Sequence, residues 1–239
     1  MRRIFNYVLS SSTAILLAGA AAHVSAQAPD PALVKEAVVQ VYGARAMGIK
    51  GFFGVHTWVA VKPTEAKSWT VYEVIGWRLR WSESVVVVRH RDPDGRWFGA
   101  EAELYADKRG AGVDELITRI DKAARDYPYA KQYTVWPGPN SNTFTAWIAR
   151  AVPELEVDLP PTAIGKDYLG GSVFGAAPSG RGYQVSLGGL LGVAASDVDG
   201  LELNILGLNI GLSPTGLKLP MLGRIGPQRR AAATAPVAN

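Results

Sequence analysis

The chain has 239 residues, of which 48% are hydrophobic and 19% are charged, a composition typical of a globular protein rather than a disordered or fibrous one. Its 25 basic and 21 acidic residues leave a net charge of +4, an excess too small and too scattered to indicate nucleic-acid binding. Cysteine is absent, which excludes disulfides, zinc–thiolate sites and thiol nucleophiles. There are only three histidines, which argues against a metal centre with several histidine ligands. We therefore expect no metal site and no other cofactor.

Residues 1–26 are expected to be a secretory signal peptide. Arg2 and Arg3 precede an apolar stretch over residues 7–22, and small residues at 24–26 supply a cleavage site. The alternative is an uncleaved anchor, but hydroxyl side chains interrupt the apolar stretch, which is shorter than the ~20 residues of a spanning helix. We therefore expect an exported protein of the periplasm or cell envelope. Its mature chain would have no membrane span and would keep 23 basic and 21 acidic residues, because the two arginines are removed.

Residues 27–160 are expected to form an α+β domain, in which an antiparallel sheet of about four strands packs with helices. The spacing of apolar residues by three and four predicts a first helix over residues 31–47. Runs of β-branched and aromatic residues predict strands over residues 52–61, 68–75, 84–89 and 97–105. Apolar spacing and flanking prolines then predict helices over residues 113–127 and 140–152.

Residues 161–227 are expected to form a glycine-rich β extension that packs on the α+β domain. Of the 26 glycines, 15 lie after residue 164, and alternating apolar residues predict strands over residues 183–194 and 201–219. Two adjacent apolar residues before Gly207 interrupt the alternation, which predicts a β-bulge in the second of these strands. The small, polar and basic residues 228–239 predict a disordered tail.

The segment 136–144, Trp-Pro-Gly-Pro-Asn-Ser-Asn-Thr-Phe, contains a candidate nucleophile. Its Pro-Gly-Pro turn places Ser141 in the first turn of the predicted helix, where free backbone amides favour negative charge and can stabilise an oxyanion. The other interpretation is that Asn140 or Ser141 only caps the helix, as polar residues at helix starts usually do. Both interpretations stay open on the sequence alone.

His56 is the candidate base for this nucleophile. If the strands over 52–61 and 68–75 form a hairpin, opposite residues have numbers that sum to about 129 or 130, so His56 faces Glu73 or Val74. A facing Glu73 would orient the imidazole and fix its tautomer. Ser141, His56 and Glu73 would then be nucleophile, base and orienting carboxylate. The alternative is a histidine with a purely structural hydrogen bond.

All seven tryptophans lie between residues 58 and 147. A bulky hydrophobic core is the favoured explanation, and an aromatic wall for a glycan or lipid is the other. Under the second explanation the candidate ligand-binding residues are Trp58, Trp136, Asn140 and Asn142.

Four runs of the sequence carry a resemblance to a known family, and they are His56-Thr57-Trp58, residues 136–144, Ala163-Ile164-Gly165-Lys166-Asp167-Tyr168, and Gly200-Leu201-Glu202-Leu203-Asn204 with Gly207-Leu208. With these runs the chain resembles the bacterial domain of unknown function 3750 over most of its mature length. That family has no assigned activity, so the resemblance implies none.

A more distant resemblance is to the permuted papain-like group, which includes the PPPDE-type deubiquitinating peptidases and the lecithin:retinol acyltransferase relatives. In that group a histidine on an early strand precedes a cysteine that opens a later helix, in an Asn-Cys-Asn-x-Phe-like context. Ser141 stands here in the cysteine position and His56 in the histidine position. The resemblance implies a papain-like fold and cleft. Because serine is a much weaker nucleophile than a thiolate, it also implies either a serine enzyme with a strong base or an inactive relative.

These observations give three functional hypotheses. The first is an exported envelope protein that binds a glycan, lipid or peptide ligand in a papain-like cleft, without thiol chemistry. The alternative is a serine-dependent hydrolase or acyltransferase that acts on amide or ester bonds of the envelope. The third is a structural module in which the conspicuous motifs are only turns and helix caps.

Overall fold

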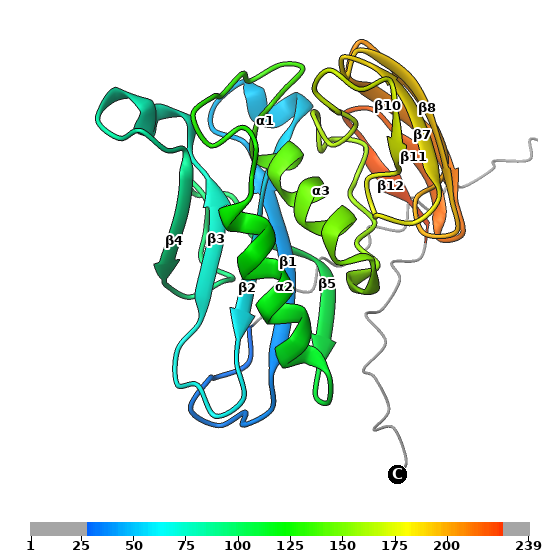
Figure 1. The fold of residues 1–239 in the computed structure, drawn as a ribbon. Helices are drawn as coiled ribbons and strands as arrows, with labels where there is room; N and C mark the ends of the chain where they lie inside the picture. The colour runs from blue at the N-terminus through cyan, green and yellow to red at the C-terminus, as the bar shows by residue number, and fades with distance from the viewer. Residues whose placement is uncertain (1–27, 227–239) are drawn as a thin grey trace, which may run out of the picture.

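The computed structural model describes residues 28–226, which form two antiparallel sheets with helices packed between and beside them (Figure 1). This arrangement confirms the α+β class and the β-rich C-terminal part. The predicted signal peptide at 1–26 and the predicted tail at 228–239 lie outside the described residues. Within residues 28–226, no helix is both long enough and apolar enough to cross a membrane.

The first sheet has five strands in the order β4-β3-β2-β1-β5, and every neighbouring pair is antiparallel. Its strands are β1 (Val38–Arg45), β2 (Val55–Lys62), β3 (Thr70–Val74), β4 (Val86–His90) and β5 (Glu103–Arg109). The short helices α1 (Lys50–Phe53) and η1 (Gly76–Arg80) connect β1 to β2 and β3 to β4.

The predicted helix over residues 31–47 is wrong, because this segment contains the strand β1. β1 pairs with β2 on one side and with β5 on the other, and seven of its eight residues are buried. A strand that is buried on both faces shows a continuous apolar run instead of alternation. Its run of valines therefore matched helical spacing by coincidence.

The helices α2 (Val113–Arg125) and α3 (Ser141–Ala151) confirm the two later helix predictions and cover one face of the first sheet. A hydrophobic core fills the space between them, with contributions from Val59 on β2, Ile120 on α2 and Phe144 on α3. The opposite face carries a second cluster around Tyr42, Trp58 and Trp69, which loops cover. The central strands of the first sheet are therefore covered on both faces, whereas the edge strand β4 exposes Val88, Arg89 and His90.

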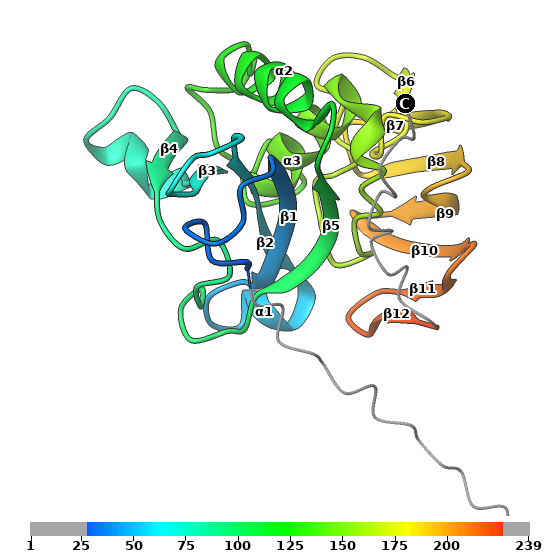
Figure 2. The ribbon, with the colours of Figure 1, turned by 90° about the horizontal axis from the view of Figure 1, so that it is seen from below.

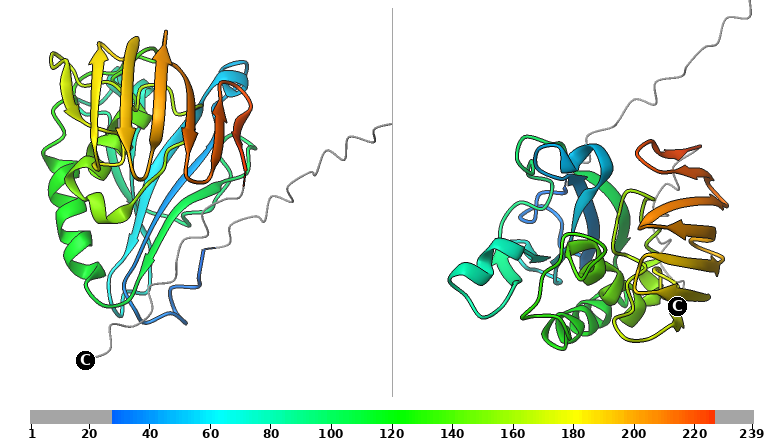
Figure 3. Two further views of the ribbon diagram at one scale, coloured as in Figure 1. Left: turned by 90° about the vertical axis from the view of Figure 1, so that its right-hand side faces the viewer. Right: turned by 90° about the horizontal axis from the view of Figure 1, so that it is seen from above.

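The second sheet is a seven-stranded antiparallel meander in the order β12-β11-β10-β9-β8-β7-β6. Its strands are β6 (Phe174–Ala176), β7 (Tyr183–Leu187), β8 (Leu191–Ser196), β9 (Gly200–Ile205), β10 (Leu208–Ser213), β11 (Gly216–Leu219) and β12 (Gly223–Ile225). This sheet stands beside the first, with α3, the short helix η2 (Pro153–Leu155) and the chain that follows them in between (Figure 2). Figure 3 shows its strands running side by side over α3.

The predicted bulge near Gly207 is instead a hairpin turn between β9 and β10. Leu206 and Gly207 have φ angles of 54° and 79°, the left-handed values that a two-residue hairpin turn of type I′ requires. The two adjacent apolar residues in the sequence therefore mark the point where one strand ends and the next restarts the alternation.

Candidate functional site

The start of α3 is held by Asn140, which lies directly before the helix. Its Oδ1 accepts hydrogen bonds from the backbone amides of Asn142 and Thr143, at 2.9 and 3.2 Å. The Thr143 hydroxyl accepts a hydrogen bond from the Asn140 amide at 3.1 Å, which completes a capping box. The helix cap is therefore Asn140 rather than Ser141.

Asn142 joins α3 to the first sheet. Its Nδ2 donates to the carbonyls of Val55 and Ile164, at 3.0 and 2.8 Å, and its Oδ1 accepts from the Thr57 hydroxyl at 3.0 Å. Asn140 Nδ2 also donates to the Ile164 carbonyl, at 3.0 Å. Both amide side chains thus serve contacts inside the protein, and a ligand could reach them only by breaking these bonds.

Ser141, the predicted nucleophile, is buried in the first turn of α3. Its carbonyl accepts a hydrogen bond from Thr57 Oγ1 at 3.3 Å, so the Thr57 side chain points toward α3. Neighbouring side chains on a strand point to opposite faces of the sheet, so His56 points away from α3. The structure therefore does not bring the Ser141 hydroxyl and the His56 imidazole together, because the first sheet lies between them.

His56 and Glu73 do lie together, on the face away from α3. His56 Nε2 is 3.1 Å from Glu73 Oε2, and both side chains are buried. The observed register pairs Val59 with Tyr72, whose numbers sum to 131 rather than to the expected 129 or 130, so the contact runs diagonally between β2 and β3. The structure thus joins the proposed base to the proposed orienting carboxylate and leaves the proposed nucleophile apart.

Two arginines complete a charged group with these residues. Arg89, on β4, donates from Nε and Nη2 to Glu73 Oε1 at 3.0 and 2.7 Å, and Arg91 Nε lies 3.4 Å from the same oxygen. Burial raises the pKa of Glu73, but the hydrogen bond from His56 and the charges of both arginines outweigh it and lower the pKa to about 2.

The same environment keeps His56 neutral. Burial lowers the pKa of His56, and the opposing effects of its hydrogen bond and charge interaction with Glu73 do not compensate. The Nε2–H of the neutral ring then donates to the Glu73 carboxylate. At neutral pH the group formed by His56, Glu73, Arg89 and Arg91 therefore carries one net positive charge, from two guanidinium groups and one carboxylate.

A cluster of aromatic rings adjoins His56. The Trp97 ring stacks on the imidazole with centroids 3.8 Å apart and an interplanar angle of 11°. Trp77 stacks on Trp97 at 6.0 Å, and Phe98 meets both indole rings edge-on. We call Trp77, Trp97 and Phe98 the aromatic platform. Trp77 is 41% exposed and Phe98 is 58% exposed, so the platform presents two rings to solvent.

The aromatic platform depends on a tight turn. The backbone groups of Trp97 and Ala100 exchange two hydrogen bonds of 2.9 Å, and Phe98 between them has a φ of 47°. A bulky residue in the left-handed region costs roughly 1–3 kcal/mol, which the surrounding contacts must offset. Gly99 has a φ of 86°, so Phe98 and Gly99 form a two-residue turn like that of Leu206 and Gly207, and this turn displays the Phe98 ring.

The two tryptophans predicted to bind a ligand lie in different surroundings. Trp58 is wholly buried, its Nε1 donates to the Pro93 carbonyl at 2.8 Å, and the Arg91 guanidinium lies 5.1 Å from its ring centroid. Trp136 is half exposed, and its Nε1 donates to the Leu206 carbonyl at 2.8 Å, which ties the start of α3 to the second sheet. The predicted ligand-binding residues therefore do not share one surface.

Sequence reasoning missed the residues that the structure gathers around His56. Arg89 and Arg91 are two positions apart, a spacing that places both on one face of a strand, and this was the available signal. The approach of Trp77 and Phe98 depends on how two loops fold over the sheet. No local pattern in the sequence encodes that approach.

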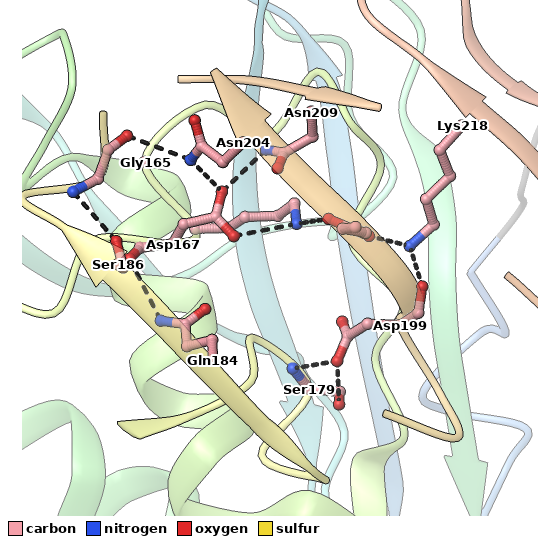
Figure 4. Close-up of polar contacts among 12 residues, drawn as sticks. Gly165, Asp167, Ser179, Gln184, Ser186, Asp199, Asn204, Asn209 and Lys218 are labelled. Atoms are coloured by element: carbon pink, nitrogen blue, oxygen red, sulfur yellow. Dashed lines mark hydrogen bonds and ion pairs between the residues drawn. The ribbon is translucent and has the colours of Figure 1, made fainter. Parts of the chain in front are cut away.

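A second polar cluster lies between the inner face of the second sheet and the preceding chain (Figure 4). Asn204 and Asn209 donate to one oxygen of Asp167, at 3.0 and 2.8 Å, and Lys166 pairs with Glu202. Lys218 pairs with Glu202 and donates to the Asp199 carbonyl at 2.9 Å.

Three carboxylates of this cluster are close enough to suggest a metal site. One oxygen from each of Asp158, Asp199 and Glu202 lies within 4.8 Å of the others. The Lys218 ammonium, however, contacts Asp158 and Glu202 directly, and Arg224 pairs with Asp158. These cations supply the charge that a metal ion would otherwise bring, so the donor set fits a buried ion-pair cluster.

Comparisons with known proteins agree with the first resemblance drawn from the sequence. No curated protein and no solved structure matches the chain. The model of one family, described as a protein of unknown function (DUF3750), matches residues 36–168, which is more than half of the chain. This region includes the first sheet, α2 and α3, whereas β6–β12 lie beyond it. The chain therefore belongs to the DUF3750 family.

Proposed function

We propose that this protein is an exported envelope protein that binds an acidic glycan without catalysing a reaction on it. The observation that carries the proposal is the aromatic platform, which exposes two rings and stacks on His56, a member of a partly buried group of net positive charge. Export is supported by the sequence of residues 1–26, and N-terminal sequencing of the protein recovered from the envelope fraction tests it.

The chemistry of the aromatic platform suits a sugar. The C–H face of a pyranose ring is apolar and packs against an exposed aromatic ring such as Trp77 or Phe98, where it buries surface from water. Arg89 is 47% exposed in its side chain and binds Glu73 through only two of its three nitrogens. A guanidinium group with donors to spare recognises a carboxylate, which favours an acidic sugar over a neutral one.

Calorimetric titration with acidic oligosaccharides and their neutral counterparts tests this proposal, for example with trigalacturonate and galactotriose. We expect the protein to prefer the acidic sugar. Trp77→Ala and Phe98→Ala should each weaken binding by about tenfold, the value of one aromatic contact. Trp81→Ala is the matched control, because Trp81 is also exposed and makes no ring contact with the aromatic platform. Binding that survives both platform substitutions, or a preference for lipids or peptides, would refute the proposal.

The serine-dependent hydrolase or acyltransferase is the second candidate, and the contact between His56 and Glu73 is the observation in its favour. The position of Ser141 on the other face of the first sheet weighs against it, because a base must come within hydrogen-bond reach of its nucleophile. A serine-reactive phosphonate probe distinguishes the two candidates. Labelling of the natural chain that disappears in Ser141→Ala would support the enzyme, and absence of labelling supports the binding protein.

A further inference from the structure

The outer face of the second sheet is a continuous apolar surface. Its side chains form three rows across the strands, in which each residue is the registered partner of the next. The rows are Phe174, Val185, Val193, Leu203 and Ile210; Ala176, Tyr183, Ala195, Leu201, Leu212, Leu217 and Ile225; and Leu187, Leu191, Ile205 and Leu208. We call this surface the outer apolar face, and it contains no charged residue.

The outer apolar face does not serve the core of its own chain. The alternate residues of the same strands, among them Gln184, Glu202, Asn204 and Lys218, point inward and form the buried polar cluster. Most large side chains of the outer apolar face are 40–70% exposed, from Leu217 at 41% to Tyr183 at 68%. Together they expose on the order of 1,000 Å² of apolar surface, well above the 300–600 Å² of the largest patch on a typical monomer.

We propose that the outer apolar face packs against the same face of a second copy of this chain, which makes a β-sandwich across a two-fold axis. Two such faces would bury roughly 2,000 Å² in total, the lower end of the range for obligate homodimers. Flat antiparallel sheets pack face to face in this way at about 10 Å separation, with their side chains interdigitated.

The charge of this region favours a protein partner over a lipid surface. Residues 161–226 contain four basic and four acidic residues, so their net charge is zero. Two of the four cations, Lys166 and Lys218, are buried in ion pairs, and Arg181 is paired with Asp197. Attachment to an anionic membrane surface usually needs basic residues around the apolar face, and the described region supplies no such excess.

The edges of the second sheet favour a closed dimer. The edge strands β6 and β12 have only three residues each, which leaves little backbone for strands of other chains to extend the sheet. Contact through the face of the sheet is isologous and ends at two copies.

The test is the mass of the protein in solution, measured by analytical ultracentrifugation over a range of concentrations. Leu203 lies in the middle of the outer apolar face, between Val193 and Ile210, and is 43% exposed. We expect a dimer for the natural chain and at least about a hundredfold larger dissociation constant for Leu203→Glu, because two carboxylates would be buried in the interface. Val88→Glu is the matched control, since Val88 is an exposed valine on β4 of the first sheet and should leave the dimer intact.

Circular dichroism shows whether Leu203→Glu is folded, and a folded monomer supports the proposal. If Leu203→Glu does not fold, the neighbouring variant Ile210→Glu is measured in its place. A natural chain that stays monomeric at about 100 μM, well above the dissociation constants of obligate dimers, overturns the proposal. So does a dimer that survives both glutamate substitutions. The natural chain could instead be a monomer that binds vesicles of phosphatidylglycerol and phosphatidylethanolamine. If Leu203→Glu abolishes this vesicle binding, the outer apolar face is a lipid-binding surface and the dimer proposal is wrong.

Discussion

The two sheets of this protein share antiparallel architecture but have opposite arrangements of polarity. The central strands of the first sheet are covered on both faces, and they turn apolar side chains toward the helices on one side and toward the loops on the other. The second sheet turns polar and charged side chains toward the protein and apolar side chains toward solvent. Alternation of polar and apolar residues along a strand therefore shows that the two faces of the sheet differ, but it does not show which face is turned toward the rest of the protein.

The difference also concerns how each sheet is joined to the rest of the chain. Hydrophobic contacts hold α2 and α3 to the first sheet, and hydrogen bonds of Asn142 fix only the start of α3. Ion pairs and amide hydrogen bonds hold the second sheet, and they fix its position because buried charges are costly unless their partners stay in place. We expect the two sheets to respond differently to loss of a charge.

The largest effect is expected from Lys218→Met, which removes the cation between Asp158 and Glu202. Breaking one partner of a buried ion pair leaves uncompensated charge, so the free energy of unfolding should fall by about 3–5 kcal/mol. Urea unfolding followed by circular dichroism measures the change. The exposed pair of Lys122 and Asp126 is the control, and Lys122→Met should change stability by less than about 1 kcal/mol. Equal effects of the two substitutions would contradict the contrast between the sheets.

Low pH should destabilise the protein by protonating Glu73 in the charged group on the first sheet. The pKa of Glu73 is about 2 in the folded protein and near 4.5 in a free carboxyl group, so the unfolded chain binds a proton first as the pH falls. The stabilisation is complete above about pH 4.5 and amounts to about 3 kcal/mol, which is lost as the pH falls from there to about 2.

Glu73→Gln removes this titration, so its stability should depend less on pH in that interval. The exposed Glu101, paired with Arg96, provides the control Glu101→Gln, which should keep the pH dependence of the natural chain. Urea unfolding midpoints between pH 2 and pH 5 measure both variants. An unchanged pH dependence in Glu73→Gln would show that other groups cause the acid sensitivity.

A smaller effect is expected at the junction between the two sheets. Asn140 caps α3 and also bonds to Ile164 on the chain that leads to the second sheet, so Asn140→Ala should lower stability by about 1–2 kcal/mol. Ser141→Ala removes no cap and should cost less than Asn140→Ala. Thermal unfolding compares the two variants. The reverse order would restore Ser141 as the cap.

The smallest effect is expected from the hairpin of the second sheet. Asparagine tolerates the left-handed conformation of Leu206 better than leucine does, so Leu206→Asn should raise stability by about 1 kcal/mol. Val88, which is 53% exposed and lies within β4 of the first sheet, outside the outer apolar face, is the control. Val88→Asn should not stabilise the protein, because asparagine is unfavourable in strands. Thermal unfolding of both variants measures the difference, and equal shifts would contradict the turn assignment.

The sequence predicted those parts of the fold that depend on local pattern. The helices α2 and α3 have apolar spacing on one side and clear ends. Alternation also predicted strands over residues 183–194 and 201–219, but each of these segments contains turns, which divide the first into β7 and β8 and the second into β9, β10 and β11. The proximity of His56 and Glu73 followed from the hairpin. The observed register differs by two residues from the one in which they face each other, so both side chains stay on the same face and make a diagonal contact.

The remaining features depend on contacts between distant segments. The sequence of β1 resembled that of a helix because β1 is a central strand between β2 and β5 and is buried on both faces. Such a strand lacks the alternation of polar and apolar residues that identifies a half-exposed strand. The separation of Ser141 from His56 is set by Thr57, which is adjacent to His56 in sequence but points to the opposite face. Neither fact can be read from a single segment, because each depends on which face of the sheet the helices cover.

The buried cluster of the second sheet has a consequence for where this protein can be divided. Asp158 and Lys166 lie within the stretch that defines the DUF3750 family, whereas their partners Lys218 and Glu202 lie beyond it. A truncated chain that stops at residue 168 would keep one partner of each ion pair and lose the other, so it would contain charged side chains without their partners. The segment that the family model matches is therefore shorter than the segment in which these buried charges find their partners.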